Sequence, residues 1–314
     1  MKKIVGIIAA VAMAASVFAV DFTAGARVEG DLFSYNGNTK TISALSLSQV
    51  NQDYHKPFNF TVSGDRAGAT VKINTNSRAT TTNSTYNIWF KPFDAVKVEF
   101  GSVSLAMHTE TMGWYRRILN YDTWGYKAAA TFGDATVTLA LIPGTAWFTK
   151  ADGVDAVIGE TNIAVEYNAD FGNLMAMADF TNSFDTIKVA AGYKGSFGAI
   201  SFFVDYMFTK AAANSNNITA DFKYAQDAIT FEAYTNVGIA NNTSAQVVAR
   251  FSYAFDTFNS YLEFDSGNVL ADSFDATIKA DISGNLGAMA WEVAAQYAIG
   301  SKTFSIPFNV AVAF

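Results

Sequence analysis

The most informative pattern in the sequence is an alternation of apolar and polar positions within segments of about ten residues. In the last segment, 303–314, the apolar residues fall on every second position: Phe304, Ile306, Phe308, Val310, Val312 and Phe314. Successive side chains of a β-strand point to opposite faces, whereas a helix would mix the two sets on every face. The pattern therefore predicts a strand with one wholly apolar face, and it recurs along most of the chain.

Charged residues in these alternating segments occupy the face opposite to the apolar one. They are Arg27, Glu29, Asp31, Asp205, Arg250, Lys279, Asp281 and Glu292. An Arg or Lys facing lipid at mid-bilayer costs about 2–4 kcal/mol, whereas the lumen of a membrane barrel tolerates charge. A soluble sandwich could also alternate, but the number of segments and the absence of helical periodicity weigh against it. We therefore predict that the apolar faces meet lipid and that these eight residues line a lumen.

Two kinds of connection separate the segments. Eight short turns rich in Gly, Asp and Asn alternate with nine longer, polar loops, which predicts an all-β, antiparallel transmembrane barrel of about 18 strands. The strand-like stretch Thr41–Val50 lies inside the first predicted loop, Ser34–Pro57, and 16 strands remain an alternative. Five short turns place a Phe directly before Gly or Asp, as an aromatic girdle at one membrane interface would.

The N-terminus has the three parts of a secretory signal peptide. Lys2 and Lys3 precede an apolar run from Ile4 to Val17, and cleavage is expected after Ala19. The run is shorter than the roughly 20 residues that a membrane-spanning helix needs. Residues 1–19 are thus predicted to be a signal peptide and 20–314 a single barrel domain. The chain has no Cys and a net charge of −7, and this acidic balance argues against a nucleic-acid partner.

The signal peptide, the alternating strands and the final Val310-Ala311-Val312-Ala313-Phe314 together resemble the outer-membrane porins and related barrels of double-membraned bacteria. The resemblance implies an outer-membrane location and passive diffusion of small hydrophilic solutes or ions. It also implies that a terminal motif, here Phe308, Val310, Val312 and Phe314, is recognised by the barrel-assembly machinery. It leaves a homotrimer open, and a surface adhesin or antigen that uses the barrel as scaffold is the alternative function. Pro307 lacks a ladder donor, so we expect a local irregularity there.

In porins the third external loop commonly folds inward, and here the third predicted loop is Leu105–Asp122. The resemblance implies a pore constriction, with candidate residues His108, Glu110, Tyr115, Arg116 and Arg117. The chain has two histidines, His55 and His108, which we interpret as solvated loop residues. With no Cys, no G-x-S-x-G motif and no zinc-ligand spacing, we expect no enzyme, metal or cofactor.

Overall fold

The computed structural model describes residues 19–52, 58–75, 82–112, 116–143, 158–181, 186–240, 243–273 and 275–313. These ranges form twenty strands and no helix. The first ten are β1 (Ala19–Thr23), β2 (Gly25–Asn36), β3 (Thr41–Gln52), β4 (Phe58–Ser63), β5 (Ala67–Thr75), β6 (Thr82–Phe93), β7 (Val96–Ala106), β8 (Asn120–Phe132), β9 (Ala135–Pro143) and β10 (Ile158–Ala169). The others are β11 (Gly172–Thr181), β12 (Ile187–Phe197), β13 (Ile200–Lys210), β14 (Ser215–Gln226), β15 (Ile229–Ile239), β16 (Ser244–Ala254), β17 (Phe258–Asp265), β18 (Thr277–Leu286), β19 (Met289–Ala298) and β20 (Thr303–Ala313). Within the same ranges, no helix is suited to crossing a membrane.

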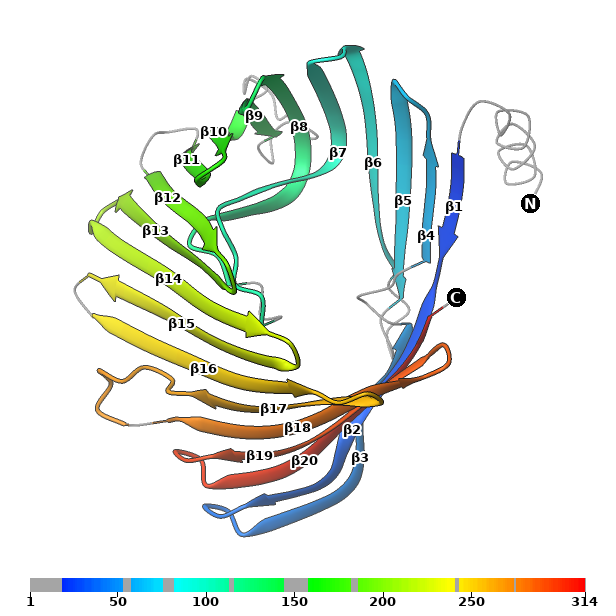
Figure 1. The fold of residues 1–314 in the computed structure, drawn as a ribbon, viewed down its shortest axis with the longest axis vertical. Coiled ribbons are helices and arrows are strands. Elements are labelled where there is room, and N and C mark those ends of the chain that lie inside the picture. Colours follow the sequence, from blue (N-terminus) through cyan, green and yellow to red (C-terminus); the bar gives the residue numbers. More distant parts are fainter. Residues whose placement is uncertain are drawn as a thin grey trace, which may run out of the picture.

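Antiparallel pairing follows the chain from β4 to β20, each strand lying beside the next. β20 also pairs with β2, β2 with β3, and β4 with β1. The ladder therefore ends at β3 and β1 and is not closed by strand pairing among the described residues. Only Ala24 separates β1 from β2, so a single run of chain contacts both sides of this junction. Figure 1 shows the strands arranged around a central space, with this run at one side of the ring.

The structure has twenty strands where 18 were predicted, and both additional strands lie near the N-terminus. The first predicted strand is divided at Ala24, and the ambiguous stretch inside the predicted first loop forms β3. A tight turn supports β3: the Asn36 side chain accepts hydrogen bonds from the backbone of Asn38 and Thr39, and Lys40 adopts a φ of 55°. All eight predicted short turns lie between strands. The five Phe residues that precede Gly or Asp in these turns are all exposed: Phe93, Phe132, Phe171, Phe197 and Phe255.

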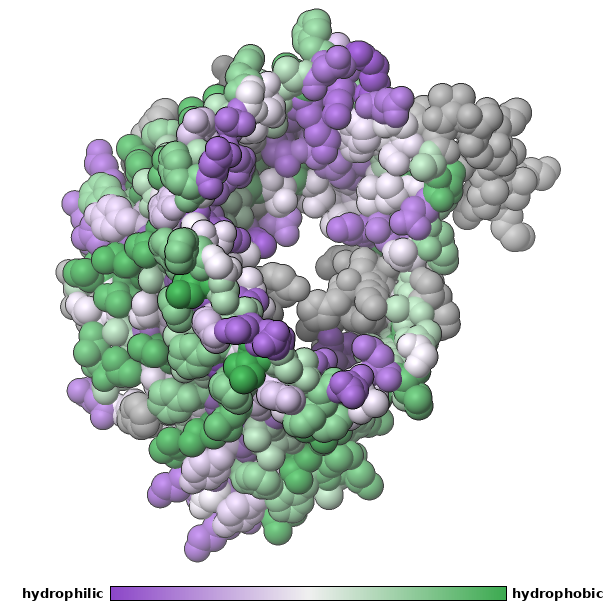
Figure 2. Space-filling view, viewed as in Figure 1, coloured by the Kyte–Doolittle hydropathy of each residue, from purple (hydrophilic) through white to green (hydrophobic). Residues whose placement is uncertain are grey.

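The two faces of the strands are exposed in the reverse of the order found in a water-soluble protein. In β13, Phe203 and Asp205 are buried at 1% and 0% exposure, whereas Val204 and Tyr206 between and after them are 49% and 45% exposed. The outer surface is accordingly rich in apolar residues, while polar residues gather towards the central opening (Figure 2). A surface of this kind is stable in lipid and costly in water. The predicted alternation is thus confirmed, with its apolar face outward.

The expected irregularity at Pro307 is confirmed on both neighbours of β20. The pairing with β19 is interrupted between Phe308 and Ser305, and β2 shifts register between Asp31 and Phe33, opposite Pro307. A proline cannot donate to the ladder, so the partner strand accommodates an extra residue as a bulge. Phe308, Val310 and Val312 lie in β20, whereas Phe314 and the predicted signal sequence up to residue 18 lie outside the described residues.

Candidate pore constriction

The connection between β7 and β8, residues 107–119, folds into the ring instead of away from it. We call this segment the inner loop; residues 113–115, and with them the candidate Tyr115, lie outside the described residues. In Figure 1 the loop runs from β7 and β8 towards the inner side of β13 and β14. Its contacts extend from β9 to β17, so it crosses a large part of the inner wall.

An apolar cluster attaches both ends of the inner loop to the wall. Met107, Ile118 and Leu119 of the loop are buried against one residue from each of four consecutive strands: Ile142 in β9, Ala164 in β10, Met177 in β11 and Ala190 in β12. Complete burial of a Leu, Ile or Met side chain contributes roughly 1.5–3 kcal/mol. These contacts give the loop a hydrophobic base inside a barrel whose inner face is otherwise largely polar.

His108 connects the beginning of the loop to two strands. Its Nδ1 lies 2.6 Å from Asp205 Oδ1 in β13, and its Nε2 lies 2.7 Å from Asn173 Oδ1 in β11. Burial alone would lower the pKa of His108, but the hydrogen bonds to Asp205 and Asn173 outweigh that effect and raise it above its ordinary value. The interpretation of His108 as a solvated histidine is therefore wrong, because the loop folds inward. His55 lies outside the described residues.

The middle of the loop binds β14, β15 and β16. The Thr111 backbone N–H and hydroxyl donate to the two carboxylate oxygens of Glu232, at 2.7 and 2.8 Å, and the hydroxyl accepts from Lys223 at 2.7 Å. Met112 packs in a second buried cluster, and its carbonyl accepts from Arg250 Nη1 at 2.6 Å. Glu110 is 3% exposed beside these groups. Sequence reasoning missed Thr111 and Met112, since neither residue type indicates a role without its partner.

The two adjacent arginines of the loop have different positions. The Arg116 guanidinium donates to Asp265 at the end of β17, at 3.1 Å, and lies 5.5 Å from the ring centroid of Tyr234. Arg117 instead donates to Asn120 at the base of the loop, at 3.2 Å. Of the candidate constriction residues, His108 and Arg116 therefore contact the inner wall. Glu110 accepts from the Arg116 backbone N–H within the loop, at 3.1 Å, and the described contact of Arg117 is also within its own region of chain.

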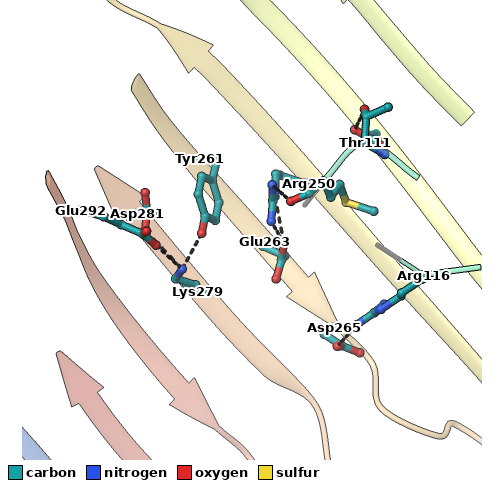
Figure 3. Close-up of polar contacts among 11 residues, drawn as sticks. Thr111, Arg116, Arg250, Tyr261, Glu263, Asp265, Lys279, Asp281 and Glu292 are labelled. Atoms are coloured by element: carbon teal, nitrogen blue, oxygen red, sulfur yellow. Dashed lines mark hydrogen bonds and ion pairs between the residues drawn. The ribbon is translucent and has the colours of Figure 1, made fainter. Parts of the chain in front are cut away.

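Opposite charges face each other across five neighbouring strands of this wall. The register aligns Lys223 of β14, Glu232 of β15, Arg250 of β16, Glu263 of β17 and Lys279 of β18. Arg250 donates to Glu263 through Nε at 2.8 Å and Nη2 at 2.5 Å, as seen in Figure 3. Directly opposed unlike charges stabilise adjacent strands, so the row fixes the register and neutralises most of its own charge.

The remaining predicted lumen residues lie further along the same inner face. Lys279 donates to Glu292 at 2.8 Å and to the Tyr261 hydroxyl at 2.5 Å, and its Nζ is 3.3 Å from Asp281 (Figure 3). Arg27 Nε is 2.9 Å from Glu29, on β2. Each of these groups is buried or half-buried, on the face opposite the exposed apolar residues.

No family model and no curated protein matches the chain. Solved structures do match: OccAB4 of Acinetobacter baumannii, with a TM-score of 0.62, 10% identity and coverage of 95% of this chain and 98% of that one. OccK2 (OpdF) of Pseudomonas aeruginosa gives 0.64 at 8% identity, covering 94% and 97%, and the P. aeruginosa outer membrane protein opdK gives 0.58 at 9%, covering 94% and 99%. The chain has the fold of these outer-membrane porins. At such low identity the likeness concerns the porin fold and leaves the solute to the residues of this chain.

Proposed function

We propose that the protein is a bacterial outer-membrane channel for passive diffusion of small hydrophilic solutes or ions, and that the inner loop narrows its pore. The observation that carries the proposal is the combination of an apolar outer face with charged residues on the inner face of one ring of strands. An opening through the molecule is visible in Figure 2, bordered by polar residues. Barrels of this size enclose a water-filled lumen, whereas eight-stranded barrels are filled by side chains.

In this proposal the constriction lies between the inner loop and the wall that the loop leaves uncovered. His108, Glu110 and Arg116 would hold the loop in place, with Tyr115 and Arg117 as further candidates. Arg27, Glu29, Asp31, Asp205, Arg250, Lys279, Asp281 and Glu292 would line the lumen. Pore selection would depend on width and on these charges. The similarity to channel structures supports this role rather than a catalytic one.

Delivery to the membrane is part of the same proposal. Residues 1–19 would be removed as a signal peptide, and Phe308, Val310, Val312 and Phe314 would form the signal for the barrel-assembly machinery. The alternation of apolar residues along β20 supports this assignment. A homotrimer is compatible with the fold, and its test is the molecular mass of the purified protein in detergent.

Planar-bilayer recording of the purified protein tests the proposal. We expect discrete conductance steps in KCl, with a linear current–voltage relation at low voltage, because the pore is passive. Heat-denatured protein at the same detergent concentration is the control. Protease protection in liposomes verifies that the protein has inserted. If inserted protein gives no conductance, the result would contradict the channel and would favour the adhesin.

A further inference from the structure

A pocket of about 250 Å³ lies in the inner wall where β2, β18, β19 and β20 meet. It is separate from the contacts of the inner loop, and it contains the irregularity caused by Pro307. Its polar lining comprises Arg27, Glu29, Asp31, Lys279, Glu292, Gln296 and Asn309. Five of these seven carry charge, so the pocket would attract a charged solute that passes through the pore.

The bases of the pocket already have acidic partners. Arg27 is paired with Glu29, and Lys279 is shared by Glu292 and Asp281. Asp31, in contrast, has no ion pair or side-chain hydrogen bond with any described residue. The carbonyl Oδ1 of Asn309 is buried and likewise lacks a described donor. The pocket thus holds a negative charge, that of Asp31, without a partner among the described residues.

We propose that this pocket binds the ammonium group of small amine solutes as they cross the channel. An ammonium has three N–H donors and a positive charge, which match the Asp31 carboxylate. The carboxylates of Asp31 and Glu29 would repel an anion, and both bases of the pocket, Arg27 and Lys279, are already paired with acidic residues. The inference rests on the proposed channel function and adds a class of solute to it.

Block of the single-channel potassium current by 1,4-diaminobutane tests the pocket, with uncharged 1,4-butanediol as the matched probe. We expect the diamine to interrupt the current at concentrations where the diol does not, and Asp31→Asn to weaken the block about fivefold, equivalent to about 1 kcal/mol. Asp134→Asn is the control, because it removes a carboxylate in the turn between β8 and β9. The diamine should block this variant as strongly as it blocks the unaltered protein.

If the diamine and the diol had equal effects, or if the block were unchanged in Asp31→Asn, the proposed amine binding would be refuted. The proposed channel function would not be affected. Absence of any conductance would instead contradict the proposed function. In that case calorimetric titration of the detergent-solubilised protein with 1,4-diaminobutane decides the matter: saturable binding that Asp31→Asn weakens supports the pocket, and no heat of binding refutes it.

A second inference concerns His108 and rests on different contacts. The Asn173 amide nitrogen donates to Glu166 and to Asn168, each at 2.6 Å, which fixes the orientation of the amide. Its carbonyl oxygen must therefore face His108 Nε2, while a carboxylate oxygen of Asp205 faces Nδ1. Two acceptors require two N–H donors, and only the protonated imidazolium has them. If the Asn173 amide were rotated, its oxygen would face the acceptor oxygens of Glu166 and Asn168.

We propose that His108 is a proton-dependent latch that holds the start of the inner loop to β11 and β13. The groups facing it are Asp205 of β13, which favours the imidazolium, Lys194 of β12, which opposes it, and Glu166 of β10 behind Asn173. The Phe203 ring lies 5.9 Å away and excludes water on one side. Because the folded pKa is raised, the latch contributes fully below the ordinary histidine pKa of about 6.5 and is lost as pH rises through the folded value.

Single-channel recordings between pH 5 and pH 9 test the latch, with open-channel current noise as the readout of loop motion. We expect noise to rise severalfold with pH in the unaltered protein, and to be independent of pH in His108→Gln. A Gln side chain keeps a donor and an acceptor but cannot change charge. Unaltered protein without pH dependence, or His108→Gln with the original dependence, would refute the latch.

Discussion

The inner wall has two regions that share one strand pattern and differ in what covers them. Beneath the inner loop, Asn162, Asp205 and Thr219 have 0% exposure, although each lies on the polar face of its strand. On β2 and β19, which the loop leaves uncovered, the side chains of Arg27, Glu29 and Glu292 are 14%, 23% and 35% exposed. We call these the covered wall and the open wall. Strand periodicity determines which face a residue occupies, and the position of the inner loop determines whether that face is buried or exposed to solvent.

The largest expected effect is that of removing the cover itself. Replacing residues 109–118 by a short Gly-Ser link should raise single-channel conductance roughly twofold or more, since the pore width at its narrowest point governs passage. The control replaces residues 211–214, in the connection between β13 and β14, and should conduct like the unaltered protein. Unchanged conductance in the first variant would mean that the loop does not constrict the pore.

Breaking an ion pair should cost more on the covered wall than on the open one. Arg250→Met removes the guanidinium that pairs with Glu263, whose side chain is 4% exposed, and we expect a loss of about 3 kcal/mol in the free energy of unfolding. Arg27→Met on the open wall should cost about 1 kcal/mol or less, because water can solvate Glu29. Urea unfolding in lipid vesicles measures both. Equal losses would contradict the distinction between the walls.

Replacing a small side chain by a larger one should also destabilise the covered wall more than the open wall, though by less than a broken ion pair. Ala190 is completely buried beneath the loop, so Ala190→Leu should destabilise the protein by about 1–3 kcal/mol or displace the loop. Ser283 of β18 pairs directly with Glu292 and is half-exposed, so it belongs to the open wall. Ser283→Leu should change stability by less than about 0.5 kcal/mol. The same unfolding experiment compares the pair, and a greater loss in Ser283→Leu would reverse the assignment of covered and open wall.

The alternation of single strands could be predicted because it is local. In β13 the sequence pattern alone assigns Asp205 and Val204 to opposite faces, and all eight short turns were marked by Gly, Asp or Asn. The assignment of Thr41–Val50 stayed ambiguous, because whether a strand pairs depends on its neighbour as well as on its own residues.

The contacts of the inner loop could not be predicted in the same way. Thr111 binds Glu232 across 121 positions of sequence, and Arg116 binds Asp265 across 149. No periodicity links such residues, so the resemblance to porins could indicate an inward loop but not its partners. For His108 the loop histidine was recognised, while its burial followed only from the position of Asp205 and Asn173 in the fold.

Cysteine labelling tests most directly the claim that the loop covers one side of a water-filled pore. The chain has no native Cys, so Thr219→Cys on the covered wall and Ser283→Cys on the open wall each provide a single thiol. With a charged, membrane-impermeant thiol reagent in liposomes, we predict rapid labelling of Ser283→Cys and protection of Thr219→Cys, with the protection lost when residues 109–118 are replaced. Equally rapid labelling of both with the loop intact, or labelling of neither, would contradict the account.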